Sequence, residues 1–240
     1  MMKQLMQRAL QWSSTRKYLV FLLAVVLVVG GAFGIRVLTH ETVHISGLLE
    51  YKSADDLFAQ SSLVAVGQIT EKGDAIRVQH VTEKSAGNFT DYTFAISSLI
   101  QGQPVADTVT VRVRGGTAGN VTEICEESPR FSEGETYLLF LYQPGMGGAY
   151  HTAGDYYYLC GLDQGVYTAD SSGRYVSVYG ETLSSARLAA AKGAGSVNKT
   201  FARDQFLENQ RRNLANGFIT QAEYDALVDS MDTYAEVISK

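Results

Sequence analysis

The stretch VTVRVR, at residues 109–114, contains the strongest secondary-structure signal in this chain. Its three valines alternate with Thr110, Arg112 and Arg114. A β-strand places successive side chains on opposite faces, so this two-residue period predicts a strand. We therefore expect a β-sheet built around residues 109–114.

Further strand signals lie on both sides of this stretch. They occupy residues 63–69, 92–97, 137–141, 156–159, 165–167 and 174–176. Turn signals such as Lys72-Gly73-Asp74 and Gly115-Gly116 separate them. Several short strands at this spacing predict a barrel or a sandwich, which we assign to residues 53–181. A short helix, capped by Ser53, is expected at its start.

Four stretches of residues 58–180 resemble a loosely defined group of bacterial extracytoplasmic domains. They are VAVGQI (64–69), YTFAISSLIQG (92–102), VTVRVRGG (109–116) and FSEGETYLLFL (131–141). A similar arrangement occurs in the netrin-like domains of tissue inhibitors of metalloproteinases, which are five-stranded OB barrels. The resemblance covers about half the chain and implies a mainly β fold with a small OB-like β-barrel. The inhibitory edge of those proteins starts at a free N-terminal Cys that this chain lacks, so inhibition is not implied.

The N-terminal region contains an uncharged run of 18 residues from Tyr18 to Ile35. As a helix it spans roughly 27 Å, close to the hydrocarbon thickness of a bilayer. Arg16 and Lys17 precede it, and such bases stay on the cytoplasmic side. We expect a cytoplasmic N-terminus at 1–17, a transmembrane anchor at 18–38 and a tether at 39–52, with the rest extracytoplasmic. The alternative is a cleaved signal peptide, for which Ala32-Phe33-Gly34 offers a small-x-small site.

The C-terminal region, residues 182–240, is expected to be helical. Thr182 to Lys192 is rich in Ala and Leu. Thr220-Gln221-Ala222-Glu223 forms a capping box, and apolar residues follow at helical spacing as far as Ala235. We expect a helical hairpin over the last forty residues that packs on the barrel or contacts a partner.

The charge distribution argues against a nucleic-acid partner. The chain has 20 basic and 25 acidic residues. Four of the bases precede Ile35, so 16 bases and 25 acids remain, a net charge of about −9. An acidic surface repels phosphate backbones.

Cys125 and Cys160 are the two cysteines of the chain. Outside the cytoplasm such a pair predicts a structural disulfide. The alternative is a sortase-like thiol nucleophile, in which Cys160 would act with His80 and Arg174. The threonines that precede a sortase cysteine are missing here.

Other patterns do not predict a metal, cofactor or catalytic site. The four histidines are scattered, and residues 216–223 match only the second half of a calcium-binding loop, without early oxygen ligands. Gly115–Gly119 follows no phosphate-binding pattern. The acids Glu126, Glu127, Asp155 and Asp163 could serve a hydrolase, but the sequence does not reveal which of them converge.

Tyrosine is concentrated in one region, since nine of the 14 lie between Tyr137 and Tyr179. Tyrosine is amphipathic and enriched in recognition surfaces, so we predict that Tyr156, Tyr157 and Tyr158 bind a partner. The alternative is that they are half-buried strand residues. The expected function is a non-enzymatic, membrane-anchored envelope protein that binds a protein or a cell-wall glycan. The alternative is an envelope enzyme, either a sortase-like thiol transpeptidase or a carboxylate-based cell-wall hydrolase.

Overall fold

The computed structural model describes residues 18, 21–23, 25–26, 40–47, 49–104, 106–143, 149–192, 207–208, 210–230 and 234–240. The chain divides into two compact units, residues 1–41 and 42–240. In the first unit, the described residues 18, 21–23 and 25–26 are helical. Within these described ranges, no helix combines the length and apolar character that a bilayer crossing requires. The anchor predicted at 18–38 lies mostly outside them.

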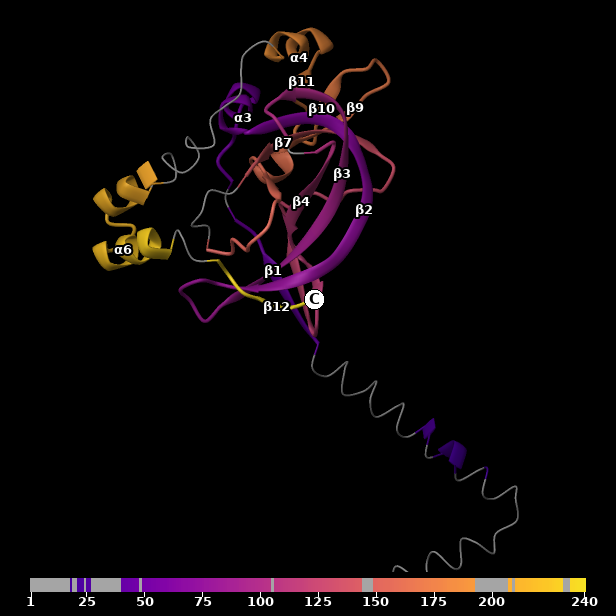
Figure 1. Ribbon diagram of the computed structural model, residues 1–240, viewed down its shortest axis with the longest axis vertical. Coiled ribbons are helices and arrows are strands. Elements are labelled where there is room, and N and C mark those ends of the chain that lie inside the picture. Colours follow the sequence, from indigo (N-terminus) through magenta and orange to yellow (C-terminus); the bar gives the residue numbers. More distant parts are fainter. Residues whose placement is uncertain are drawn as a thin grey trace, which may run out of the picture. The chain divides into compact units, whose positions relative to one another are not determined.

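The second unit is mainly β, which confirms this part of the predicted fold (Figure 1). Its strands are β1 (Glu41–Ile45), β2 (Leu63–Gln79), β3 (Ala86–Gln101), β4 (Thr108–Arg114), β5 (Gly116–Ala118), β6 (Val121–Cys125), β7 (Thr136–Tyr142), β8 (Tyr157–Leu159), β9 (Val166–Ala169), β10 (Tyr175–Ser177), β11 (Thr182–Leu183) and β12 (Val237–Ser239). Its helices include α3 (Ala54–Gln60), the 3₁₀ turn η1 (Leu162–Gly165), α4 (Ser185–Ala191) and α6 (Gln221–Ser230). Every strand predicted from the sequence is present.

The large sheet has the order β11-β10-β9-β7-β8-β4-β3-β2-β12, and β1-β6-β5 form a smaller one. The long strands β2 and β3 curve together along most of their length (Figure 1). The first half of β2 also pairs with β7. The pairing of β4 with β8 is parallel, whereas the other pairings of this sheet are antiparallel. The sheet as a whole is not closed and has free edges at β11 and β12, whereas a small OB-like β-barrel was predicted.

Two large apolar clusters form most of the core, on the two faces of the sheet, and a smaller third cluster contains Val78 and Phe89. The first contains Val109, Val111 and Val113 of β4 together with alternate residues of β2, β3 and β7. The second contains Leu138 and Phe140 of β7 and packs against both α3 and α4. Alternate residues of β7 serve each cluster, which explains why residues 137–141 are apolar throughout.

Both ends of the second unit differ from the predictions. Residues 41–45 of the predicted tether form β1, and the Glu126 N–H donates to the Ile45 carbonyl at 3.0 Å. Residues 237–239 of the predicted helical region form β12, which pairs with β2. The N–H of Ala235 donates to the His151 carbonyl at 2.7 Å, which ties the chain beside β12 to the segment before β8. Both segments are strands because their backbone groups form hydrogen bonds with distant strands. The local sequence does not reveal such partners, so these strands were not predicted.

The starts of α3 and α6 were predicted correctly, whereas the helix expected from Thr182 begins at Ser185, after β11. Ser53 and Asp56 form a capping box at α3. At α6, Glu223 Oε2 accepts the Thr220 N–H at 2.7 Å, and Thr220 Oγ1 accepts the Glu223 N–H at 3.3 Å. Residues 210–215 are also helical.

The β5–β6 hairpin is held against β3 by Asn88, which is fully buried. Its Nδ2 donates to the Gly116 and Val121 carbonyls, at 2.9 Å each. The Asn88 N–H donates to Glu123 Oε2 at 3.0 Å. Gly116 has a φ of 115°, and a Cβ there would collide with Thr90 Oγ1. Only glycine allows this close approach between the hairpin and β3.

Candidate functional site

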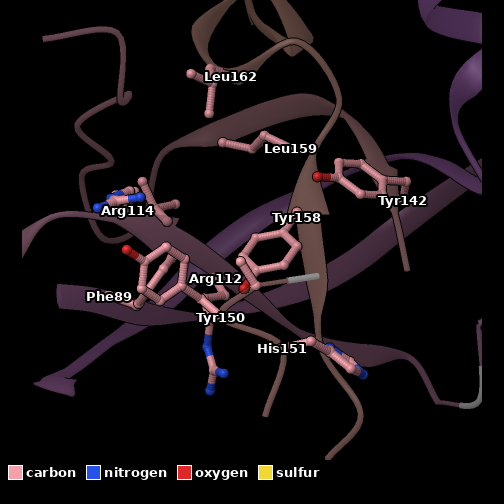
Figure 2. A pocket seen from close by; sticks show the side chains of 11 residues that line it. Phe89, Arg112, Arg114, Tyr142, Tyr150, His151, Tyr158, Leu159 and Leu162 are labelled. Atoms are coloured by element: carbon pink, nitrogen blue, oxygen red, sulfur yellow. The ribbon is translucent and has the colours of Figure 1, made fainter. Parts of the chain in front are cut away.

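A cavity of about 220 Å³ lies beside the ends of β4 and β8 (Figure 2). Its walls are mostly aromatic and apolar, with two arginines. The lining residues are Phe89, Arg112, Val113, Arg114, Tyr142, Ala149, Tyr150, His151, Tyr158, Leu159 and Leu162.

Tyr158 connects the aromatic walls of this cavity. Its ring centroid lies 5.9 Å from that of Tyr142 and 6.3 Å from that of Phe89. Phe89 in turn lies 5.6 Å from Tyr150. These separations suit favourable aromatic pairs, so the rings support one another as a rigid wall.

Two tyrosine hydroxyls of the cavity, those of Tyr142 and Tyr158, stay protonated far above neutral pH. Burial raises the pKa of Tyr142 to about 12, with the neighbouring Cys160 and Tyr156 adding to the effect. Burial is also the main cause that raises the pKa of Tyr158, followed by Tyr156. Both groups are therefore available as neutral hydrogen-bond donors and acceptors.

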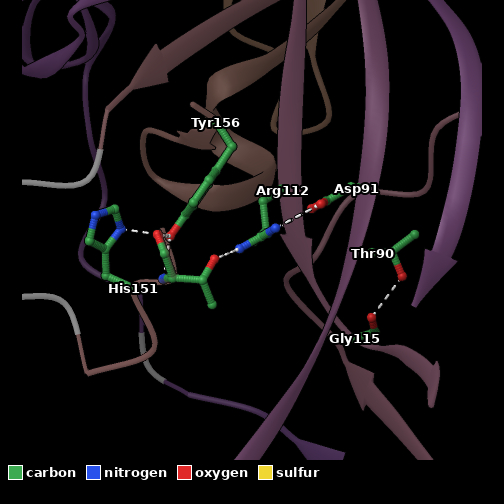
Figure 3. A network of polar contacts seen from close by, with 7 residues as sticks. Thr90, Asp91, Arg112, Gly115, His151 and Tyr156 are labelled. Atoms are coloured by element: carbon green, nitrogen blue, oxygen red, sulfur yellow. Dashed lines mark hydrogen bonds and ion pairs between the residues drawn. The ribbon is translucent and has the colours of Figure 1, made fainter. Parts of the chain in front are cut away.

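Arg112 is the centre of a buried polar network (Figure 3). Its Nε and one terminal nitrogen donate to the two carboxylate oxygens of Asp91, at 2.7 Å each, and the other donates to Thr152 Oγ1 at 2.5 Å. Its guanidinium lies 3.9 Å from the ring centroid of Tyr156. Burial alone would lower the pKa of Arg112, but the hydrogen bonds and charge of Asp91 outweigh it, so the pKa is raised. Arg112 is thus a permanent cation, neutralised by Asp91.

Arg114 is neutralised in the same way. Its Nε donates to Glu123 Oε1 at 2.5 Å, and its guanidinium lies 4.8 Å from the ring centroid of Tyr150. Both cations of the cavity are therefore ion-paired. The cavity combines apolar rings with hydrogen-bonding groups whose charges are balanced.

His151 lies beside this network and is buried. Its Nδ1 is 2.6 Å from the Tyr156 hydroxyl, which also accepts the Thr152 N–H at 2.9 Å. The ring centroid of Tyr234 lies 5.4 Å from that of the imidazole. Burial, and then the charge of Arg112, lower the pKa of His151 from its ordinary value of 6.5.

We expect His151 to make the fold less stable in acid. Between pH 6.5 and its lowered folded pKa, the unfolded chain binds a proton at His151 that the folded chain does not. The free energy of unfolding therefore falls as the pH decreases through this window. Urea denaturation at pH 7.5 and at pH 5.5 measures the slope, and His151→Gln should reduce it. An unchanged slope in His151→Gln would assign the acid sensitivity to other groups.

Leu162 adds an unusual backbone feature to the cavity wall. Its φ is 55°, in the left-handed region, directly after Gly161 with a φ of 70°. Such a conformation costs a leucine roughly 1–3 kcal/mol, and this kind of strain is concentrated at functional sites.

The three tyrosines predicted as binding residues have different positions. Tyr157 is buried in the first core cluster and pairs with Val111. Tyr156 is buried beneath Arg112. Only Tyr158 lines the cavity, together with Tyr142 and Tyr150, which the sequence did not distinguish from the other tyrosines.

The predicted disulfide between Cys125 and Cys160 is absent, since both are free thiols. Cys125 Sγ lies 3.7 Å from Glu127 Oε2, whereas Cys160 Sγ lies 4.0 Å from Gln60 Oε1. Burial raises the pKa of Cys160, which opposes formation of a nucleophilic thiolate.

The other two members of the sortase-like arrangement contact different neighbours. The His80 Nδ1 accepts the Thr82 and Glu83 N–H groups, and Arg174 forms an ion pair with Asp170. None of these contacts involves Cys160.

Two of the four predicted acids lie close together. The N–H of Asp163 donates to the Glu127 carbonyl at 3.2 Å. Burial, and to a smaller extent Glu127, raise the pKa of Asp163, whereas hydrogen bonds led by that from the Gly47 N–H lower the pKa of Glu127. Neither acid lines the aromatic cavity.

Neither the metal-binding side chains of the described residues nor the comparisons with known proteins indicate which chemistry this site performs. In the part of the chain that the structure describes, no three His, Cys, Asp or Glu side chains are grouped so as to hold a metal. Comparisons with protein-family models, with curated proteins and with solved structures found no significant match to this chain.

Proposed function

We propose that this chain is a non-enzymatic, membrane-anchored binding protein of the cell envelope, and that its aromatic cavity binds one sugar ring of a cell-wall glycan. The observation that carries the proposal is the cavity between Tyr142, Tyr150, Tyr158 and Phe89. Sugar rings have apolar C–H faces and polar hydroxyl edges. Rigid aromatic walls with neutral hydroxyls and ion-paired arginines complement both features.

The size of the cavity favours one ring. Pockets for drug-sized ligands measure roughly 300–1,000 Å³. The volume here is about 220 Å³. A single ring of a longer glycan fits this volume, with the remainder of the chain outside.

The N-terminal segment supports the proposed location, and the charge bears on the ligand. We infer that the uncharged run from Tyr18 to Ile35 anchors the chain and that residues beyond it are extracytoplasmic. The net charge of about −9 after Ile35 disfavours nucleic acid as the ligand.

We further propose that β2, β3, β4, β8 and β7 form an OB-like barrel related to the netrin-like domains. Two observations support this assignment: the pairing of β7 with β2, and the parallel pairing of β4 with β8. An OB barrel likewise places its third strand parallel to its fifth. OB barrels bind oligosaccharides as well as oligonucleotides, which agrees with a glycan ligand.

Tyr158→Ala tests the proposal, because it removes the ring that connects the cavity walls. We expect glycan binding to weaken by about tenfold, the equivalent of ~1.4 kcal/mol and within the range of one good aromatic contact. The measurement is co-sedimentation of the full-length protein, in detergent, with insoluble cell-wall glycan.

Two further variants control for general effects. Tyr51→Ala removes a tyrosine that is 66% exposed and does not line the cavity, so it should bind normally. Tyr158→Phe keeps the ring and should retain most of the affinity. The proposal fails if Tyr158→Ala remains folded by circular dichroism and binds like wild type, or if Tyr51→Ala weakens binding equally.

A carboxylate-based hydrolase is the second candidate, favoured by the opposite pKa shifts of Glu127 and Asp163. Such opposed shifts are typical of acid–base pairs. The same incubation distinguishes this function, because a hydrolase releases soluble reducing ends. Release that Glu127→Gln abolishes would replace the binding proposal.

A further inference from the structure

A second cavity, of about 200 Å³, lies where β2, β3 and β4 meet the β5–β6 hairpin. Lys72 of β2, Tyr92 of β3, Arg114 of β4, Cys125 of β6 and Arg130 contribute to its lining. The contacts of Asn88 and Gly116 described above hold the hairpin against β3 and so maintain this space.

The lining of this cavity carries excess positive charge. Glu123 is its one acidic lining residue, and it is 4% exposed. Its oxygens accept the Asn88 N–H and the Arg114 Nε–H, so Arg114 neutralises it. Lys72 and Arg130 remain, and within the described residues neither has an ion-pair partner.

The neighbouring acid Glu133 forms no ion pair with Lys72 or Arg130 within the described residues. Its Oε1 accepts the backbone N–H of Lys72 at 3.2 Å, and Glu133 does not line the cavity. Two cations thus face one small polar space in a protein whose overall charge is negative.

We propose that this second cavity binds a small oxyanion, a phosphate or carboxylate group, through Lys72 and Arg130. A guanidinium offers a planar pair of donors to such a group, and an ammonium adds a compact charge. Tyr92 and Val113 line the same space as these cations. The inference rests on these residues and is independent of the sugar site.

Cys125 provides a reporter inside this cavity. It is partly exposed, whereas Cys160 is 4% exposed. A neutral thiol reagent should therefore label Cys125 in the folded, reduced protein. A bound anion should slow that labelling by covering the thiol.

The experiment uses reduced full-length protein in detergent and N-ethylmaleimide, with inorganic phosphate replacing chloride at constant ionic strength. Peptide mass spectrometry identifies the labelled thiol. We expect phosphate at saturation to slow Cys125 labelling by about tenfold, because reaction requires access to the thiol. Phosphate should also raise the melting temperature. Lys72→Gln and Arg130→Gln should abolish both effects.

Lys84→Gln is the matched control, since it removes the same charge from an exposed lysine outside the cavity. It should leave the phosphate effects unchanged. Equal effects of phosphate in wild type and Lys72→Gln would overturn the proposal, as would the absence of any change in melting temperature. The phosphate result does not depend on whether Tyr158→Ala weakens glycan binding, so the two proposed sites are tested separately.

Acetate and glucose phosphate distinguish the source of the anion. Protection by phosphate and acetate at similar concentrations supports a site for free small anions. Protection by glucose phosphate at roughly tenfold lower concentration supports an anionic group carried by a sugar, since the ring adds contacts. Either result supports the oxyanion site.

Discussion

Asp91→Ala is expected to lower the free energy of unfolding by about 3 kcal/mol, because it leaves a buried guanidinium without its carboxylate. Arg112 is 7% exposed and donates two hydrogen bonds to Asp91. The Asp91 side chain is 30% exposed, so water compensates part of the loss and the effect falls at the lower end for buried ion pairs. Urea denaturation of the full-length protein in detergent measures the change.

Two comparisons separate burial from charge. Arg112→Met combined with Asp91→Leu replaces the pair by apolar groups and should recover most of the stability that Asp91→Ala loses. Arg174→Ala removes an exposed partner of Asp170 and should have little effect. A midpoint for Asp91→Ala that equals the wild-type midpoint would mean that water solvates Arg112 and that the network does not stabilise the fold.

The period of β4 predicted the strand but not the environment of its second face. The valines enter the first core cluster, as alternation requires. Alternation also suggests that the arginines face solvent, yet Arg112 is buried. Its partners Asp91, Thr152 and Tyr156 lie 21 to 44 positions away in sequence, and no local pattern connects them.

The same period explains which of the three tyrosines lines the aromatic cavity. Three consecutive strand residues cannot share a face, so Tyr157 must point opposite to Tyr158. Applying this rule to residues 156–158 identifies Tyr157 as the core residue. Nothing in the sequence indicates that Tyr142 and Tyr150 line the same cavity, because they are brought together by β7 and the segment before β8.

The prediction of a turn at Gly73, within β2, was wrong. Lys72-Gly73-Asp74 was predicted to be a turn, but β2 continues through it to Gln79. The pairing with β3 shifts register between Lys72 and Ala75, as in a β-bulge. A turn and a bulge use the same residue types, and only the partner strand distinguishes them. This bulge region places Lys72 at the second cavity, so the misread glycine lies beside a proposed site.

Asn88→Ala is the second substitution with a large expected effect, because Asn88 holds the hairpin that forms the second cavity. The change removes two donors to the Gly116 and Val121 carbonyls and the acceptor of Arg77 Nη1, 2.9 Å away. Buried carbonyls without partners cost roughly 1–3 kcal/mol each. We expect the free energy of unfolding to fall by about 3 kcal/mol, as measured by urea denaturation.

Thr117→Ala is the matched control on the same hairpin. It removes an exposed hydrogen bond between the Thr117 and Thr122 hydroxyls and should leave stability nearly unchanged. If Asn88 fixes the position of the β5–β6 hairpin, Cys125 should react faster with N-ethylmaleimide in Asn88→Ala than in wild type. Phosphate should then no longer slow the labelling of Cys125. Normal stability together with normal protection would show that β5 and β6 hold their position without this side chain. The Glu123 contacts to Arg114 and to the residue 88 N–H, which survive in the variant, would then be sufficient to fix the hairpin.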